Sequence, residues 1–190
     1  LFRSRDLELG RDADTGGQTL YVLDLVRSLA QRPEVERVDV VTRLVQDRRV
    51  AADYGRSVEV MAPGARILRF PFGPQRYLRK EQLWPHLEDL ADQLVYHLSQ
   101  PGQEVDWIHA HYADAGFVGA LVSQRLDLPL VFTGHSLGRE KQRRLLAGGG
   151  DRQQIEQAYA MSRRIDAEEQ ALTQADLVIT STQQEADLQY

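Results

Sequence analysis

The chain has 190 residues, of which 42% are hydrophobic and 27% are charged, enough for one well-buried domain and too few for two of ordinary size. Its formal net charge of -5 argues against general nucleic-acid binding, since domains that bind nucleic acids are usually basic. The absence of cysteine excludes disulfides and thiolate metal sites and fits a cytoplasmic setting. No apolar run approaches the ~20 residues of a membrane span, and no signal peptide opens the chain.

Short β-branched runs alternate with amphipathic segments along the chain. In chain order, the spacing predicts a helix at Gln18–Ala30, strands at Val38–Val41 and Arg66–Phe70, a helix at Leu83–Leu98, a strand at Trp107–Ala110, a helix at Ala115–Leu126, a strand at Leu130–Thr133, a long helix over residues 154–172 and a strand at Leu177–Thr180. This alternation predicts an α/β fold, a Rossmann-like doubly wound and mostly parallel sheet with helices on both faces.

Both ends of the chain look cut. Sheets of this kind normally begin with a strand, a glycine loop and a helix, and no first strand precedes the glycine loop here. The chain stops at Tyr190, inside a helix that is expected to begin near Thr182. We expect residues 1–190 to be a single Rossmann-like domain truncated at both ends; a complete small domain with an unusual edge is the alternative.

The segment Asp14–Gln18 is a glycine loop directly before an apolar helix. Gly16 and Gly17 let the backbone approach a ligand closely, and the N–H groups at the helix start favour an anion or a polar sugar edge. The loop has neither the spacing of dinucleotide-binding loops nor that of a P-loop, so it does not predict an NAD or ATP site. A purely structural helix cap is the alternative.

Polar side chains follow the predicted strand at Trp107–Ala110. Ligands gather outside the carboxyl ends of such strands, so His111 either lines a site or is structural. We expect His109 and His111 to point to opposite faces of the strand, and with no third ligand at convincing spacing a metal site is disfavoured. Asp114 is a candidate N-cap of the next helix.

The segment Thr133–Lys141 also follows a strand and combines a hydroxyl, an imidazole and two cations. Core packing does not require that set, so the segment indicates a loop that binds sugar and phosphate. Ser136 next to His135 does not predict a hydrolase, because adjacent residues do not form a nucleophile–base pair and the Gly-x-Ser-x-Gly elbow is missing.

Arg163 and Arg164 are consecutive residues of a predicted helix. They point about 100° apart, so at most one faces a site squarely. A guanidinium is the preferred side-chain group for binding a phosphate, because it can donate two parallel N–H hydrogen bonds to it. A solvated helix face is the alternative for this pair.

Six segments in this order resemble the sucrose-phosphate synthase family of retaining glycosyltransferases, of the short bacterial or cyanobacterial type. They are Leu7–Gln18, Lys80–Trp84, His111–Gly116, Thr133–Gly138, Arg163–Ile165 and Ile179–Glu185. The related sucrose synthases typically carry alanine, leucine and glutamate where this chain has Ser136, Leu137 and Gly138 after the loop histidine, so the resemblance favours the phosphate-accepting family.

The resemblance implies the GT-B fold, in which two Rossmann-like domains face each other across the active site. The amino-terminal domain, corresponding to residues 1–190, would bind fructose 6-phosphate. The absent carboxy-terminal domain, with its paired glutamates, would bind UDP-glucose or ADP-glucose. The reaction implied is glucosyl transfer to fructose 6-phosphate with retention of configuration, giving sucrose 6-phosphate. The family's histidine–glycine pair would precede Leu1, so the fragment alone is expected to be inactive.

The resemblance also implies roles for single residues. His135 and Gly17 would lie at the reaction centre, and the substrate-binding residues would be Gly16, Gly17, Gln18, Lys80, His111, Lys141, Arg163 and Arg164. Of these, Lys80, Lys141 and Arg164 would hold the acceptor phosphate, with Arg163 a weaker candidate. No cofactor or obligatory metal is implied, and no nucleic acid or membrane partner; sucrose-phosphate phosphatase is a candidate partner. Sucrose synthase and a non-catalytic sugar-phosphate-binding module are the alternative functions.

Overall fold

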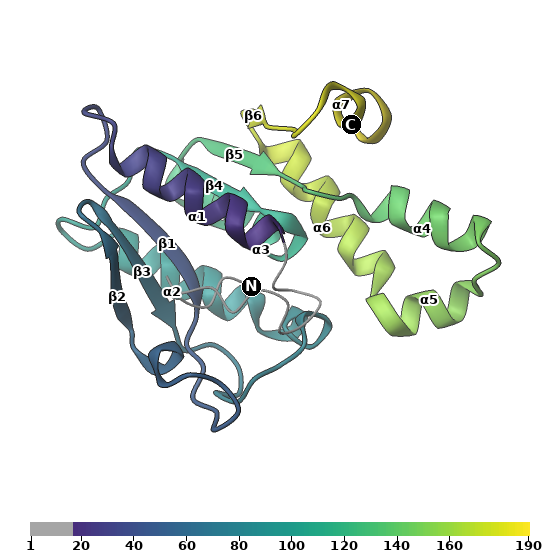
Figure 1. The fold of residues 1–190 in the computed structure, drawn as a ribbon, viewed down its shortest axis with the longest axis horizontal. Coiled ribbons are helices and arrows are strands. Elements are labelled where there is room, and N and C mark those ends of the chain that lie inside the picture. Colours follow the sequence, from purple (N-terminus) through teal and green to yellow (C-terminus); the bar gives the residue numbers. More distant parts are fainter. Residues whose placement is uncertain (1–16) are drawn as a thin grey trace. The chain divides into compact units, whose positions relative to one another are not determined.

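The structure of the protein is a computed structural model that describes residues 17–190. The chain divides into two compact units, Leu1–Lys80 and Glu81–Tyr190, which are described in turn. Figure 1 labels the helices and strands of both units.

The first unit has a three-stranded sheet and one α-helix in its described part. The elements are α1 (Gly17–Ala30), β1 (Val38–Arg43), a 3-10 turn at Ala52–Gly55, β2 (Val58–Ala62) and β3 (Ala65–Phe70). The strand order is β1-β3-β2, with β1 parallel and β2 antiparallel to β3. Val26 of α1 packs with Val40 and Ile67 to form the core, because these apolar side chains face one another from the helix and from two neighbouring strands.

The second unit has a parallel sheet of three strands in the order β4-β5-β6. After 3-10 turns at Lys80–Gln82, which begins in the first unit, and Trp84–His86, its elements are α2 (Leu87–Leu98), β4 (Ile108–His111), α3 (Tyr112–Leu126), β5 (Leu130–Thr133), α4 (Gly138–Ala147), α5 (Arg152–Tyr159), α6 (Met161–Gln174), β6 (Leu177–Val178) and α7 (Gln183–Gln189). In Figure 1, α4 and α5 form a helical hairpin, and α6 leads from it back to β6.

Close packing of α3 on β5 and α6 holds the second unit together. A Cβ atom added to Gly116 would come within 2.7 Å of the Phe132 ring and 2.9 Å of the Ala171 Cβ. Phe132, Leu130 and Ala171 are fully buried in the same core. The glycine in α3 therefore permits the close approach of this helix to β5 and α6.

The structure confirms the alternating α/β fold, with the predicted strands at β1, β3, β4, β5 and β6. Three helix boundaries differ. Helix α2 begins at Leu87, because Trp84–His86 forms a 3-10 turn around a proline. Helix α3 begins at Tyr112, so Asp114 lies in its first turn and is not the N-cap. The long helix expected over residues 154–172 is two helices, because Ala160 has a φ of 45° and ends α5.

Two elements, β2 and α4, were not predicted from the sequence. Strand β2 alternates only weakly, and its valines are exposed at the edge of the sheet: Val58 is 50% and Val60 is 66% exposed. Helix α4 is largely polar, so no apolar stripe marks it, and the segment expected to be a loop up to Lys141 is helical from Gly138 onward. None of the helices from α1 to α7 is long and apolar enough to cross a membrane.

Candidate functional site at the ends of two parallel strands

Three imidazoles line the carboxyl ends of β4 and β5 in the second unit. Strand pairing places His109 beside Val131 and His111 beside Thr133. His109 Nε2 lies 2.9 Å from the Thr133 hydroxyl, and His111 Nδ1 lies 3.0 Å from His135 Nε2. The rings of His109 and His111 are 4.0 Å apart between centroids. The strands thus form one contiguous group of imidazoles.

This arrangement corrects the expectation that His109 and His111 point to opposite faces. Residues two apart in a strand lie on the same face, since side chains alternate with a period of two. Their rings therefore come together, and the chain's turn after β5 adds the ring of His135. Within residues 17–190, no group of three or more His, Cys, Asp or Glu side chains is arranged to hold a metal ion.

Burial keeps these imidazoles neutral at physiological pH. Burial, reinforced by the neighbouring rings, lowers the pKa of His111 to about 3 and that of His109 to about 4. Burial also lowers the pKa of His135. In a neutral pair, one of His111 and His135 donates its N–H to a ring nitrogen of the other. Neutral imidazoles can both donate and accept hydrogen bonds, as sugar hydroxyls do.

Arg164 of α6 makes several polar contacts next to this group of imidazoles. Its side chain is only 4% exposed, and Nε donates to Glu168 Oε1 over 2.8 Å. Nη2 donates to the carbonyl and the hydroxyl of Ser136, over 2.5 and 3.2 Å. The guanidinium also stacks 4.6 Å above the ring centroid of Tyr112. Nη1 makes no hydrogen bond within residues 17–190, so one edge of the fork is available to a ligand.

Glu168 connects Arg164 to the start of α4. Its Oε2 accepts a hydrogen bond from the Gly138 backbone N–H over 2.6 Å. Burial raises the pKa of Glu168, an effect that the hydrogen bond and charge of Arg164 oppose. The carboxylate therefore fixes both the guanidinium and the backbone that follows the His135 turn.

The backbone at this site is strained at two non-glycine residues. Tyr112 has a φ of 75° and His135 a φ of 58°, a region that costs such residues roughly 1–3 kcal/mol each. At each of these residues the backbone turns sharply after the preceding strand, which is β4 for Tyr112 and β5 for His135. It places the Tyr112 ring against Arg164 and the His135 ring against His111.

Residues of α7 and the chain's last tyrosine close over the same turn. The hydroxyl of Tyr190 accepts a hydrogen bond from Gly134 N–H over 3.0 Å, and Gln189 Oε1 accepts one from Leu137 N–H over 3.3 Å. Burial raises the pKa of Tyr190. These contacts hold the backbone on either side of His135.

Besides Arg164, two expected phosphate-binding cations lie on helices of this unit. Lys141, in the first turns of α4, has its Nζ 3.8 Å from the ring centroid of Tyr159. Arg163 is exposed on α6, and its Cζ lies 6.0 Å from the ring centroid of Trp84. The structure joins His111, His135 and Arg164 through direct contacts or through Ser136, whereas Lys141 and Arg163 make other contacts.

The remaining expected site residues lie in the first unit. Gly17 is the first residue of α1 and is exposed, and Gln18 is half-buried beside it. Gly16 lies outside the described residues. Lys80 is half-buried at the last position of the unit.

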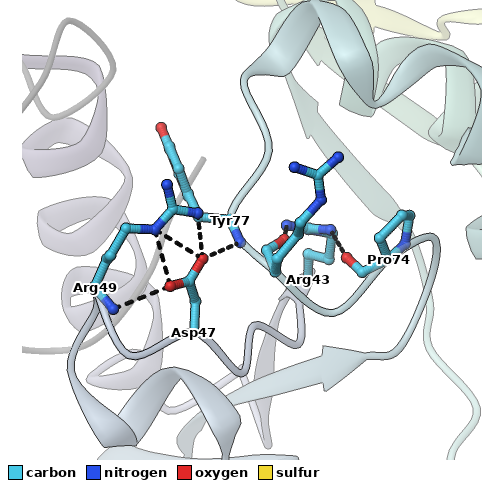
Figure 2. A network of polar contacts seen from close by, with 6 residues as sticks. Arg43, Asp47, Arg49, Pro74 and Tyr77 are labelled. Carbon is cyan, nitrogen blue, oxygen red and sulfur yellow. Dashed lines mark hydrogen bonds and ion pairs between the residues drawn. The ribbon is translucent and has the colours of Figure 1, made fainter.

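A polar network fixes the loop that leads from β3 to Lys80 (Figure 2). The buried guanidinium of Arg43 donates to the carbonyls of Pro74 and Arg76 over 2.7 and 2.6 Å. The Asp47 carboxylate accepts from the Tyr77 backbone N–H over 3.0 Å and pairs with Arg49. Hydrogen bonds from Arg49 hold the pKa of Asp47 well below its usual range. The loop is thus held by two side chains from the end of β1 and the turn after it.

Several contributors to the site carry no clear signal in the sequence. Glu168 and Tyr112 look like ordinary helix residues, and Tyr190 follows a short polar helix. For Glu168, the spacing of four residues from Arg164 on one helix face is the available signal. The contacts of Tyr190 with Gly134 span 56 residues and have no counterpart in local spacing.

Comparisons with known proteins agree with this architecture. A model of the glycosyl transferase 4-like domain family matches residues 16–189. The whole chain is 44% identical to a probable sucrose-phosphate synthase 2 of Arabidopsis thaliana and 44% identical to a probable sucrose-phosphate synthase of Solanum tuberosum. It covers 21% of each, so the chain spans about a fifth of the length of these relatives.

A solved structure shows the same fold. The sucrose-phosphate synthase of Thermosynechococcus elongatus is 27% identical and superimposes with a TM-score of 0.71. The match covers 91% of this chain and 39% of that chain.

Proposed function

Because the chain belongs to the glycosyl transferase 4-like domain family, we propose that it is the acceptor-binding domain of a sucrose-phosphate synthase. The reaction is transfer of a glucosyl group from UDP-glucose or ADP-glucose to fructose 6-phosphate, with retention of configuration. The names of the relatives support this assignment, as does the resemblance in the motifs from the glycine loop to Glu185.

One observation carries the proposal: a buried arginine with an available edge stands next to a neutral imidazole pair. Arg164 is fixed by Glu168 and Ser136, and its Nη1 has no hydrogen bond within the described chain. Ser136 directly follows His135, so the guanidinium and the pair share one turn. A pre-positioned guanidinium suits a phosphate, and neutral imidazoles suit sugar hydroxyls.

In this proposal the phosphate of the acceptor is held by Arg164, Lys141 and Lys80, with Arg163 contributing less. Gly16, Gly17 and Gln18 approach the acceptor sugar with backbone and amide donors. His111 and His135 contact hydroxyls near the transferred carbon, and Gly17 lies near that carbon. These assignments are supported by the matching motif positions and by the chemistry of each side chain.

The catalytic contribution of this domain is positioning and hydrogen bonding. In a retaining transfer without a protein nucleophile, groups that stabilise the departing diphosphate supply much of the rate, and we assign most of those to the donor-binding domain. The neutral imidazole pair stays hydrogen-bonded without adding a charge next to the glucosyl unit. We include no obligatory metal. We place the protein in the cytoplasm, because a chain without cysteine has no disulfide that the reducing cytoplasm would break.

The acceptor preference of the full-length protein tests the proposal. Purified protein is assayed with UDP-glucose or ADP-glucose and either fructose 6-phosphate or fructose, and the disaccharide product is identified by mass. We expect sucrose 6-phosphate, with fructose used far less efficiently. Equal efficiency with fructose would favour a sucrose synthase instead, and no transfer to either acceptor would favour a non-catalytic sugar-phosphate-binding module.

The variant Arg164→Gln tests whether the preference for fructose 6-phosphate arises at the site around Arg164. It should raise the KM for fructose 6-phosphate while leaving the KM for the sugar nucleotide nearly unchanged. The matched control is Arg125→Gln, on the exposed face of α3, where the arginine pairs with Asp92 at the surface.

A further inference from the structure

The carboxylate of Glu168 is held between two helices. Its Oε1 accepts a hydrogen bond from Arg164 Nε, one turn earlier on α6, over 2.8 Å. Its Oε2 accepts one from the backbone N–H of Gly138, the first residue of α4, over 2.6 Å. Glu168 is only 3% exposed. Each carboxylate oxygen therefore has its own donor, and the position of Glu168 is set by a helix other than the one that carries Arg164.

The contact between Glu168 and α4 requires a glycine at position 138. A Cβ atom added to Gly138 would lie 3.0 Å from Glu168 Oε2 and 2.9 Å from Ile165 Cγ1. Both distances are shorter than ordinary van der Waals contact, and the buried carboxylate is enclosed by its surroundings. Even a methyl group at this position would therefore displace Glu168 from the backbone N–H.

The guanidinium of Arg164 is constrained on three sides. Glu168 binds Nε, Ser136 binds Nη2 through its carbonyl and hydroxyl, and the ring of Tyr112 covers one face. Because a guanidinium is planar and rigid, fixing these parts also fixes the directions of the N–H bonds on Nη1. The orientation of the group that remains for a ligand is thus set by its contacts with the protein.

A carboxylate next to Arg164 has two opposed effects on phosphate binding. Its negative charge weakens the attraction of the guanidinium for an anion, and its hydrogen bond restricts a side chain that otherwise has many rotamers. Without Glu168, the buried Nε–H would have no acceptor, and the guanidinium would have to turn to find one. Burial therefore favours the second effect, in which the carboxylate orients the cation.

We propose that Glu168 is a positioning residue, held by the backbone of Gly138, that sets the orientation in which Arg164 meets the phosphate of the acceptor. The inference rests on the proposed function, in which Arg164 binds that phosphate. Glu168 itself does not touch the substrate. Its contribution is to reduce the conformational entropy that Arg164 loses when the phosphate binds.

The test uses the full-length protein and two variants that disturb the contact in different ways. Glu168→Gln keeps the shape of the side chain but replaces one acceptor oxygen with an amide donor, so one of the two N–H groups faces another donor. Gly138→Ala keeps the carboxylate and its charge but displaces it. Both variants should raise the KM for fructose 6-phosphate by about tenfold and leave the KM for the sugar nucleotide unchanged.

Each variant has a matched control in the same helix. Glu169→Gln makes the same substitution one residue later on α6, where the exposed carboxylate pairs with Arg139 at the surface. Gly148→Ala lies at the other end of α4, where φ is -78° and an added Cβ would come no closer than 3.5 Å to its neighbours. Both controls should match the parent protein in the KM for either substrate.

The direction of the change in KM decides between the two effects of the carboxylate. A lowered KM for fructose 6-phosphate in Glu168→Gln would show that the residue acts through its charge, which overturns the inference, and an unchanged KM would overturn it as well. An equal rise in the KM for both substrates would show a general loss of structure and would also overturn it. If Glu168→Gln does not fold, Gly138→Ala decides by the same criteria.

A double-mutant cycle shows whether the effect passes through the guanidinium. In the Arg164→Gln background, Glu168→Gln should add no further rise in the KM for fructose 6-phosphate. A rise of the same size in both backgrounds would overturn the inference. Urea unfolding of the same four proteins, without substrate, should give non-additive midpoints, and additive midpoints would show that the contact is absent.

The parent protein separates this inference from the proposed function. If the parent prefers fructose 6-phosphate and Glu168→Gln keeps the parent's KM, the inference fails and the acceptor assignment stands. If the parent uses fructose and fructose 6-phosphate equally, the acceptor assignment fails, and with it the role given to Glu168.

Discussion

His111 and His135 are hydrogen-bonded to each other through their rings, with 3.0 Å between Nδ1 and Nε2, although 24 residues separate them in the chain. The contact exists because β4 and β5 are parallel neighbours and because His135, two residues after the end of β5, adopts a left-handed backbone conformation. It makes one imidazole the partner of the other. At least one of the two rings must be neutral, because its unprotonated nitrogen accepts the hydrogen bond that the other ring donates.

The imidazole group makes stability depend on pH. Burial depresses the pKa of His111 to about 3 and that of His109 to about 4, below the ordinary value of 6.5. Between pH 6.5 and about 4 the unfolded chain therefore binds more protons than the folded chain, so acidification favours unfolding. The stabilisation that the neutral, buried histidines provide is fully present above pH 6.5. It is lost as the pH falls towards and through their pKa values in the folded protein.

The size of this effect is measured by urea unfolding at pH 7.5, 6.0 and 4.5. We expect the protein to lose on the order of 1–3 kcal/mol that a His111→Gln variant does not lose over the same range. Carboxylates titrate equally in both proteins, so the difference between the two curves reports the histidine. If the free energy of unfolding of the two proteins changed by the same amount with pH, the conclusion that His111 is buried and neutral would be wrong.

Replacement of Arg164 should destabilise the protein by leaving a carboxylate buried without its partner. Arg164→Gln is expected to cost about 3–5 kcal/mol in the free energy of unfolding, because Glu168 is also buried. Arg164→Lys keeps the charge but loses the fork that reaches both Glu168 and Ser136, and should cost about 1–3 kcal/mol. Arg163→Lys, on the exposed side of the same helix, is the control and should stay within about 0.5 kcal/mol of the parent.

An alanine at Gly116 should disturb the packing of α3. Its Cβ would lie 2.7 Å from the Phe132 ring and 2.9 Å from Ala171, too close for either neighbour to remain in place. Overpacking of this kind costs about 1–3 kcal/mol, despite the better helix propensity of alanine. Gln124→Ala, at an exposed position of the same helix, should be neutral or slightly stabilising in thermal unfolding. Equal stability of the two variants would show that α3 packs less closely than the structure indicates.

The edge strand β2 depends on a buried ion pair. Glu59 Oε2 lies 2.6 Å from Arg69 Nη2, with side chains 8% and 0% exposed. Glu59→Gln leaves the arginine charge buried and should cost about 3–5 kcal/mol in urea unfolding. The exposed pair of Arg32 and Glu34 provides the comparison, since Glu34→Gln should change stability by less than about 0.5 kcal/mol.

Local spacing predicted the elements whose side chains face a core. Strand β5 is a run of buried residues with Leu130 and Phe132 fully enclosed, and such a run is recognisable without knowing its neighbours. The N-cap of α7 was equally predictable, since Thr182 accepts a hydrogen bond from Glu185 N–H three residues later. Helix α4 and strand β2 were missed because their stabilising contacts are ion pairs and edge pairing, which leave no apolar period.

From the residues alone we could predict the α/β class, the approximate positions of the predicted strands and helices, and the family, because each depends on residues close together in the chain or on motifs in a given order. The folded arrangement was needed to show that His109, His111 and His135 form one group and that Arg164 is buried against Glu168 and Ser136. Those contacts depend on which strands lie side by side and on a left-handed turn at one residue. Neither is encoded in the spacing of the side chains that finally meet.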